Sequence, residues 1–199
     1  MKRSLLGHFA SLRGLRGCSL VCAFAWVALG GVAHADDVLS AKSGSVTYRI
    51  VHKLHKFEGV AKKVEGRVKL VPGGQTQVVI RIPVESFDSG NVNRDAHMKE
   101  SVEAARFPTV EVKAVADGIA VPTIFPSTVQ KTFKAQVSLH GVTQAMDIPV
   151  TLTFEAANNV IATTAFTLSV DAFKIERPSL MFVKIDDEMK IDAKLQFAP

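Results

Sequence analysis

Two pairs of residues in this sequence have types that could support acid–base or metal chemistry. Asp95 and His97 could form an acid–base pair, but side chains two positions apart on a helix point to different faces and cannot hydrogen-bond each other. His52 and His55 could share a metal on one face of a helix, whereas strand spacing places them on opposite faces, and no third ligand is nearby. We therefore predict structural roles for Asp95 and His97, ordinary loop or mouth positions for His52 and His55, and no metal site.

Covalent catalysis has little support in the sequence. Cys18 and Cys22, the two cysteines, both lie near the N-terminus, no serine stands in a nucleophile elbow, and no glycine-rich phosphate loop is present. The acidic run at residues 186–188 is predicted to be a solvated hairpin tip. These observations predict no catalytic residues and no cofactor.

Polar residues crowd without alternation between residues 87 and 108, which marks a turn followed by a helix. Gly90 can adopt a positive φ, and Asp88 can hydrogen-bond the backbone ahead of it. Because a cation at a helix N-terminus opposes the helix dipole, Arg94 needs a partner. We predict that an Asp88–Arg94 ion pair fastens the turn to the helix.

The helix itself is predicted from caps and spacing. Asn93 is a suitable N-cap, Asp95 lies in the first turn, and Arg106 would end the helix before the exit that Phe107-Pro108 forces. Met98 is part of a single apolar face that continues at i+4 and i+7. The segment is therefore expected to be a short amphipathic helix between strands.

Most of the remaining sequence alternates apolar and polar residues with the period of a strand. About eight such runs occur, within residues 46–50, 64–70, 77–84, 110–114, 129–139, 146–154, 166–170 and 189–197. Residues 52–59 are expected to be a bent strand or a mouth loop, and 117–127 to be irregular. Short turns between strands exclude a parallel sheet. The pattern predicts an all-β antiparallel fold, either an eight-stranded barrel with one short helix or a two-sheet sandwich.

The N-terminal residues have the features of a secretory signal peptide. Four basic residues precede an apolar run from Leu20 to Val32, and Ala33-His34-Ala35 fits a cleavage site before Asp36. We predict a cleaved signal peptide at residues 1–35 and one domain at residues 36–199, with an uncleaved membrane anchor as the alternative. Export to the periplasm is expected.

The basic character of the chain comes from this leader. The whole sequence has a net charge of +5, and residues 1–35 carry four basic and no acidic residues, so residues 36–199 have a net charge of +1. This charge gives no reason to expect a nucleic-acid partner. Self-association into a homodimer is left open.

Three segments resemble one known family. Residues 87–90, 94–97 and 106–108 resemble the signature of the YceI-like family, residues 139–143 resemble its L-x-H/N-G-V-T turn, and residues 187–191 resemble its final strand. The order and spacing agree over residues 44–198. The resemblance implies an exported bacterial protein with a lipocalin-like barrel that binds polyisoprenoids or other long amphiphiles.

The resemblance also favours an open cavity over a packed core. The predicted cavity residues are Phe133, Phe154, Phe166 and Leu168 from strands, with Met98 and Val102 from the helix. The predicted mouth and structural residues are Asp88, Gly90, Arg94, Asp95, His97, His140 and Gly141.

Three functions remain open at this point. The leading one is non-covalent binding of a long apolar ligand, namely a polyisoprenoid, an isoprenoid quinone or a fatty-acyl lipid, without enzymatic activity. The first alternative is an enzyme acting on such a lipid or quinone, which requires a titrating residue facing the cavity. The inward positions predicted above are all apolar. The second alternative is a stress-related structural protein with a filled barrel.

Overall fold

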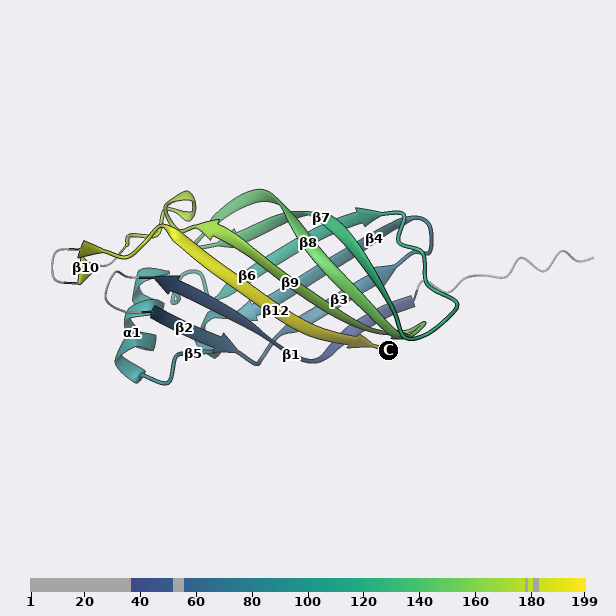
Figure 1. Ribbon diagram of the computed structural model, residues 1–199. Helices are drawn as coiled ribbons and strands as arrows, with labels where there is room; N and C mark the ends of the chain where they lie inside the picture. Colours follow the sequence, from purple (N-terminus) through teal and green to yellow (C-terminus); the bar gives the residue numbers. More distant parts are fainter. Residues whose placement is uncertain (1–36, 52–55, 178, 181–182) are drawn as a thin grey trace, which may run out of the picture. The chain divides into compact units, whose positions relative to one another are not determined.

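The computed structural model describes residues 37–51, 56–177, 179–180 and 183–199, which form antiparallel strands and a few helical turns (Figure 1). The strands are β1 (Asp37–Val51), β2 (Lys56–Ala61), β3 (Glu65–Leu70), β4 (Gln75–Pro83), β5 (Phe87–Asp88), β6 (Thr109–Asp117), β7 (Ser127–Leu139), β8 (Val142–Ala156), β9 (Asn159–Ser169), β10 (Ser179–Leu180), β11 (Val183–Lys184) and β12 (Glu188–Ala198). The helical segments are η1 (Val84–Ser86), α1 (Val92–Ser101) and η2 (Asp171–Phe173). The predicted signal peptide and the pair His52 and His55 lie outside the described residues.

Strand β1 closes the sheet into a barrel because it pairs with strands from both halves of the chain. Its residues 40–50 run antiparallel to β12, and its residues 37–40 pair with β3. Around the barrel the strands follow in the order β12, β9, β8, β7, β6, β4, β3 and β1. The predicted eight-stranded antiparallel barrel with one helix is therefore confirmed, and the sandwich alternative is wrong.

Two short strands extend the barrel beside β1. Strand β2 pairs with residues 46–51 of β1, and β5 pairs with β2. The first part of β1 pairs with β3 and its last part pairs with β2. One long strand therefore has two partners along the same edge. The described part of the segment 52–59 is thus a strand, one of the two forms expected for it.

The interior is built by simple alternation along each strand. On β7, Phe133, Ala135 and Val137 are buried while Lys134 and Gln136 are exposed. Fully burying a large apolar side chain contributes about 1.5–3 kcal/mol, so a strand with several such residues has one strongly preferred register. The same pattern on the other strands directs their apolar faces into the barrel.

The irregular segment between β6 and β7 closes the end of the barrel away from α1 (Figure 1). The N–H of Gly73 donates to the carbonyl of Ile119 at 3.1 Å, and the N–H of Gly118 donates to the carbonyl of Gly74 at 3.0 Å. These bonds fasten the segment to the turn between β3 and β4. Ile119 is fully buried there.

Helix α1 differs from the predicted helix at both ends. Its N-cap is Asn91, whose side-chain oxygen accepts a hydrogen bond from the backbone N–H of Arg94, so the predicted cap at Asn93 is wrong. The helix ends at Ser101, and turns rather than helix continue to Arg106. Within the described residues, no helix is long and apolar enough to span a membrane.

Candidate functional site

The barrel encloses a cavity of about 770 Å3. This volume lies within the range of roughly 300–1,000 Å3 that is typical of small-molecule sites. Inward-facing side chains from all eight barrel strands line the cavity, and α1 contributes side chains at one end. An interior of this size is not filled by the barrel's own side chains, which argues against the filled-barrel alternative.

The six predicted cavity residues all lie in the cavity lining. Phe133 comes from β7, Phe154 from β8, and Phe166 and Leu168 from β9. The two helix residues, Met98 and Val102, line the end next to α1. Their contact with a ligand stays a prediction. The strand residues could be placed from the sequence because side chains alternate between the two faces of a strand, so every second residue faces the barrel interior.

The turn before α1 is held by two aspartates with separate roles. A side-chain oxygen of Asp88 accepts a hydrogen bond from the N–H of Gly90 at 2.7 Å, and Gly90 has a φ of +72°, as predicted for this turn. A side-chain oxygen of Asp95 accepts from the N–H of Ser89 at 3.0 Å. Asp95 therefore joins the turn to the helix, the role that the sequence assigned to Asp88.

Arg94 forms no ion pair with Asp88 in the described part of the chain, so the predicted Asp88–Arg94 pair is wrong. One terminal nitrogen of its guanidinium group donates to the carbonyl of Ser89 at 3.4 Å, and the group lies over the ring of Phe57, 5.3 Å from the centroid. The side chain lines the cavity. Within the described residues, its guanidinium group therefore contacts an aromatic ring and a carbonyl instead of a carboxylate.

His97 and Asp95 are not in contact, as the helical spacing predicts. His97 is exposed at the cavity rim, with Nδ1 3.4 Å from a carboxylate oxygen of Glu100. The two residues therefore do not form an acid–base pair.

His140 has a structural role in the turn between β7 and β8. Its Nδ1 lies 3.0 Å from the carbonyl oxygen of Phe173, and its Nε2 lies 3.2 Å from a carboxylate oxygen of Glu103. Gly141, with a φ of +71°, lies so close to the Phe107 ring that a Cβ would come within 2.5 Å of it. The turn thus anchors two loops at the α1 end of the barrel.

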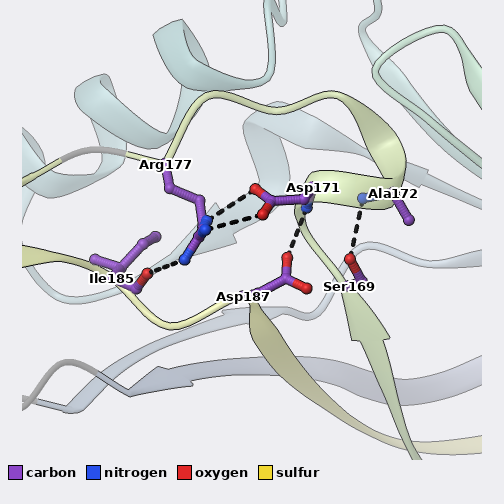
Figure 2. A network of polar contacts seen from close by, with 6 residues as sticks. All are labelled: Ser169, Asp171, Ala172, Arg177, Ile185 and Asp187. Atoms are coloured by element: carbon purple, nitrogen blue, oxygen red, sulfur yellow. Dashed lines mark hydrogen bonds and ion pairs between the residues drawn. The ribbon is translucent and has the colours of Figure 1, made fainter.

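A network around Asp171 holds the connection between β9 and β12 (Figure 2). Arg177 donates to both carboxylate oxygens of Asp171, at 2.8 and 2.9 Å, and to the carbonyl of Ile185 at 2.8 Å. The N–H of Asp171 donates to a carboxylate oxygen of Asp187 at 2.7 Å. The prediction of a solvated hairpin tip is therefore wrong for Asp187, whose carboxylate holds the backbone of the neighbouring turn.

Several polar residues of the cavity lining were missed by the sequence reasoning, and the two most buried are Tyr48 and Thr76. Tyr48 is only 8% exposed and lines the cavity at the end next to α1, so the expectation that every inward strand position is apolar is wrong. Thr76, near the opposite end, is 1% exposed, and its hydroxyl has no hydrogen-bond partner. Tyr48 lies two residues from Val46 and from Ile50, and Thr76 lies two residues from Val78. The alternation along these strands therefore already indicated that both face the interior.

Two charged residues of α1 act on the phenol of Tyr48. Burial raises the pKa of the Tyr48 phenol above its usual value, the Asp95 carboxylate raises the pKa further, and the Arg94 guanidinium lowers it in part. The phenol therefore keeps its proton at neutral pH and is a hydrogen-bond donor rather than a base.

Comparison with known proteins agrees with the fold. The barrel of a polyisoprenoid-binding domain from Saccharophagus degradans superimposes with a TM-score of 0.67 at 18% identity, covering 81% of this chain and 98% of that one. Burkholderia cenocepacia BcnA gives a TM-score of 0.63 at 18% identity, covering 77% and 95%. The Campylobacter jejuni YceI protein gives 0.57 at 11% identity, covering 75% and 86%. At these identities the similarity shows the fold alone.

The family assignment comes from the sequence. Comparison with curated proteins gives no match. A model of the YceI-like domain matches residues 38–197, which include nearly all of the barrel, its mouth and α1. The chain therefore belongs to the YceI-like domain family.

Proposed function

We propose that this protein is exported to the periplasm and holds a long apolar ligand non-covalently in its barrel, for transport, storage or sequestration. The ligand is a polyisoprenoid, an isoprenoid quinone or a fatty-acyl lipid. The observation that carries the proposal is the continuous apolar cavity of about 770 Å3, which opens beside a polar rim formed by α1. The description of the Saccharophagus protein as a polyisoprenoid-binding domain supports the same class of ligand.

The physical basis of binding would be the removal of apolar surface from water. Each Å2 of apolar surface buried contributes about 25 cal/mol, so several hundred Å2 of hydrocarbon would contribute on the order of 10 kcal/mol before the entropy of binding is subtracted. A smooth apolar wall selects for length and girth more than for functional groups. Selectivity beyond that must come from the polar residues at the rim.

The proposal is for binding without chemical conversion. Tyr48 is the titrating residue that the enzyme alternative would need, but its raised pKa keeps the phenol protonated at neutral pH, and its hydroxyl makes no hydrogen bond to a base among the described residues. Asp95 is engaged with the Ser89 N–H, and His97 points to solvent at the rim. These arrangements favour a binding protein over an enzyme.

The ligand is tested by extracting the protein with organic solvent. Protein purified from the periplasm without detergent would be extracted and the extract analysed by mass spectrometry. We expect one class of long-chain lipid in near-stoichiometric amount. A lipid-free protein that also fails to bind added isoprenoid, quinone and fatty-acyl probes would refute the proposal.

Export is tested separately. We expect cell fractionation to recover the protein in the periplasm. If residues 1–35 are cleaved, the measured mass of the intact protein should equal that of a chain that begins at Asp36. A cytoplasmic protein that retains Met1 to Ala35 would contradict export but would leave lipid binding to be judged by the extraction.

A further inference from the structure

Tyr48 provides a hydrogen-bond donor at the cavity wall that has no hydrogen-bond partner among the described residues. Only 8% of the residue is exposed and its side chain lines the cavity, but Thr76, not Tyr48, has the fully buried hydroxyl without a partner. The Tyr48 hydroxyl is therefore accessible from the cavity, and a phenol in such an apolar wall gains free energy from a partner. The donor is therefore available to a molecule in the cavity.

The fold holds this ring in place at the α1 end. Tyr48 lies directly across from Gly59 on the neighbouring strand β2, and a Cβ on Gly59 would come within 2.4 Å of the ring. Phe87 packs against the ring edge-on, with centroids 5.4 Å apart. A glycine on one side and an aromatic ring on the other therefore fix the phenol below α1.

Arg94 adds a second set of available donors at the same end. A guanidinium group has five N–H donors, and the hydrogen bond of Arg94 to the Ser89 carbonyl uses one of them. Its side chain lines the cavity. Because the group stacks over Phe57 instead of pairing with a carboxylate, its charge is not neutralised by a direct ion pair in the described part of the chain.

The other polar side chains around the mouth carry no negative charge. Asn91, His97 and Ser101 also line this end of the cavity, and the described lining residues include no Asp or Glu. The nearest carboxylate that acts on the phenol belongs to Asp95, which is occupied by the Ser89 N–H and is not part of the lining. Among the described residues, the mouth lining therefore offers hydrogen-bond donors and the positive charge of Arg94, with no carboxylate.

We propose that Tyr48 and Arg94 together bind an oxyanion head group, a carboxylate or a phosphate, at the α1 end of a long apolar chain. The inference rests on the proposed function and deepens it by naming the head group and its orientation. The head group lies at the mouth, where water can still solvate its remaining oxygens. The apolar chain extends toward Ile119 at the closed end.

The selectivity follows from the strength of charged hydrogen bonds. Bonds between an ionised oxygen and a guanidinium or phenol are stronger than bonds between neutral groups, so an acid should bind more tightly than its ester. Both share the same apolar contacts. The difference between them therefore measures the head-group site and not the cavity.

The test compares three probes with one chain length. Palmitate, methyl palmitate and hexadecyl phosphate would be titrated by displacement of an apolar fluorescent dye at about pH 8, where free carboxyl groups are ionised. We expect palmitate or hexadecyl phosphate to bind at least about tenfold more tightly than the ester. The tighter of the two acids identifies the head group as a carboxylate or a phosphate.

Two variants locate the selectivity. Tyr48→Phe removes only the hydroxyl, and Arg94→Gln removes the charge. Each should weaken binding of the preferred acid by roughly 10- to 100-fold and change binding of the ester by less than about threefold. Arg49→Gln is the matched control, because Arg49 is on the same strand as Tyr48 but pairs outside the cavity with Glu58 and Asp192.

A spectroscopic measurement separates binding from a structural effect. The carboxyl pKa of bound palmitate, followed with a carbon-13 label, should be depressed in the wild type and return toward its free value in Arg94→Gln. If palmitate is the tighter acid, an undepressed pKa in the wild type would overturn the inference; if hexadecyl phosphate is tighter, an unshifted phosphate pKa, followed by phosphorus-31 NMR, would overturn it. Equal affinity for acid and ester, or equal losses for both in Tyr48→Phe, would also overturn it while leaving the proposed function intact. Failure of all three probes to bind the wild type would refute both.

Discussion

The carboxylate of Asp95 accepts a hydrogen bond from the backbone N–H of Ser89 at 3.0 Å, which ties the first turn of α1 to the loop before it. The carboxylate also lies at the positive end of the helix dipole. One residue therefore closes the loop, stabilises the helix start and places Arg94 beside the cavity.

Replacing Asp95 should destabilise the mouth more than replacing Asp88. Asp95→Ala removes the hydrogen bond to Ser89 and the favourable interaction with the helix dipole, at a cost of about 1–2 kcal/mol. Asp88→Ala removes only the short bond to the exposed Gly90 N–H and should cost less. Urea unfolding of the two variants measures the difference. A larger effect of Asp88→Ala would contradict this assignment.

Gly141→Ala should be strongly destabilising. A positive φ costs a non-glycine residue about 1 kcal/mol, and the new Cβ would also meet the Phe107 ring at 2.5 Å, so a total of about 2–4 kcal/mol is expected. Gly73→Ala is the matched control, because Gly73 has a φ of +70° and nothing within 4 Å of the same position. Equal losses in the two variants would show that the contact with Phe107 contributes nothing.

Thr76→Val should stabilise the ligand-free protein. The hydroxyl is buried without a partner, and a methyl group of similar shape removes that unfavourable term, a gain of about 1 kcal/mol. For a domain of this size the gain corresponds to a rise of about 2–4 °C in Tm. Thr163→Val, at an exposed position on β9, is the control and should leave Tm nearly unchanged. A fall in Tm for Thr76→Val would mean that the hydroxyl has a partner such as a bound water.

Asp187 should contribute to acid sensitivity. Hydrogen bonds from the Asp171 N–H and Ser169, with the charge of Arg177 as a smaller cause, hold the pKa of the Asp187 carboxyl below its usual value. Because the pKa of Asp187 is lower in the folded state, the carboxylate stabilises the fold at pH values above its unfolded-state pKa of about 4. This stabilisation is lost as the pH falls through the lower pKa of the folded state.

The measurement is the free energy of unfolding across the acid range. Asp187→Asn should be less stable than the wild type at neutral pH, and its stability should fall less steeply below about pH 4. Asp186→Asn is the neighbouring control, since its side chain makes no hydrogen bond within the described residues. Parallel curves for the wild type and Asp187→Asn would contradict the linkage.

The sequence predicted the strands well because alternation is a local signal. Each strand needs only its own residues to reveal its inner face, which is how Phe154 and Leu168 were placed in the lining. The same signal indicates that Tyr48 faces inward, but polar chemistry was sought in the loop and not on the strands. What alternation does not reveal is that the phenol has no hydrogen-bond partner among the described residues.

The errors concern choices between competing local partners. Asn91 and Asn93 are both good caps, and the selection of Asn91 depends on which backbone N–H its side chain meets. In the same way, the choice between Asp88 and Asp95 as the fastening residue depends on the path of the turn. Tertiary geometry, rather than residue type, decides between such near-equal alternatives.

The pairing of β1 with β12 also bears on how the protein folds. Ser40 lies opposite Ala198, so the seam joins the first and last strands of the domain and requires closure of the longest loop in it. Such distant pairings form slowly. The seam is therefore expected to form late, and until it forms the apolar inner wall stays exposed to water, to chaperones and to any apolar molecule nearby.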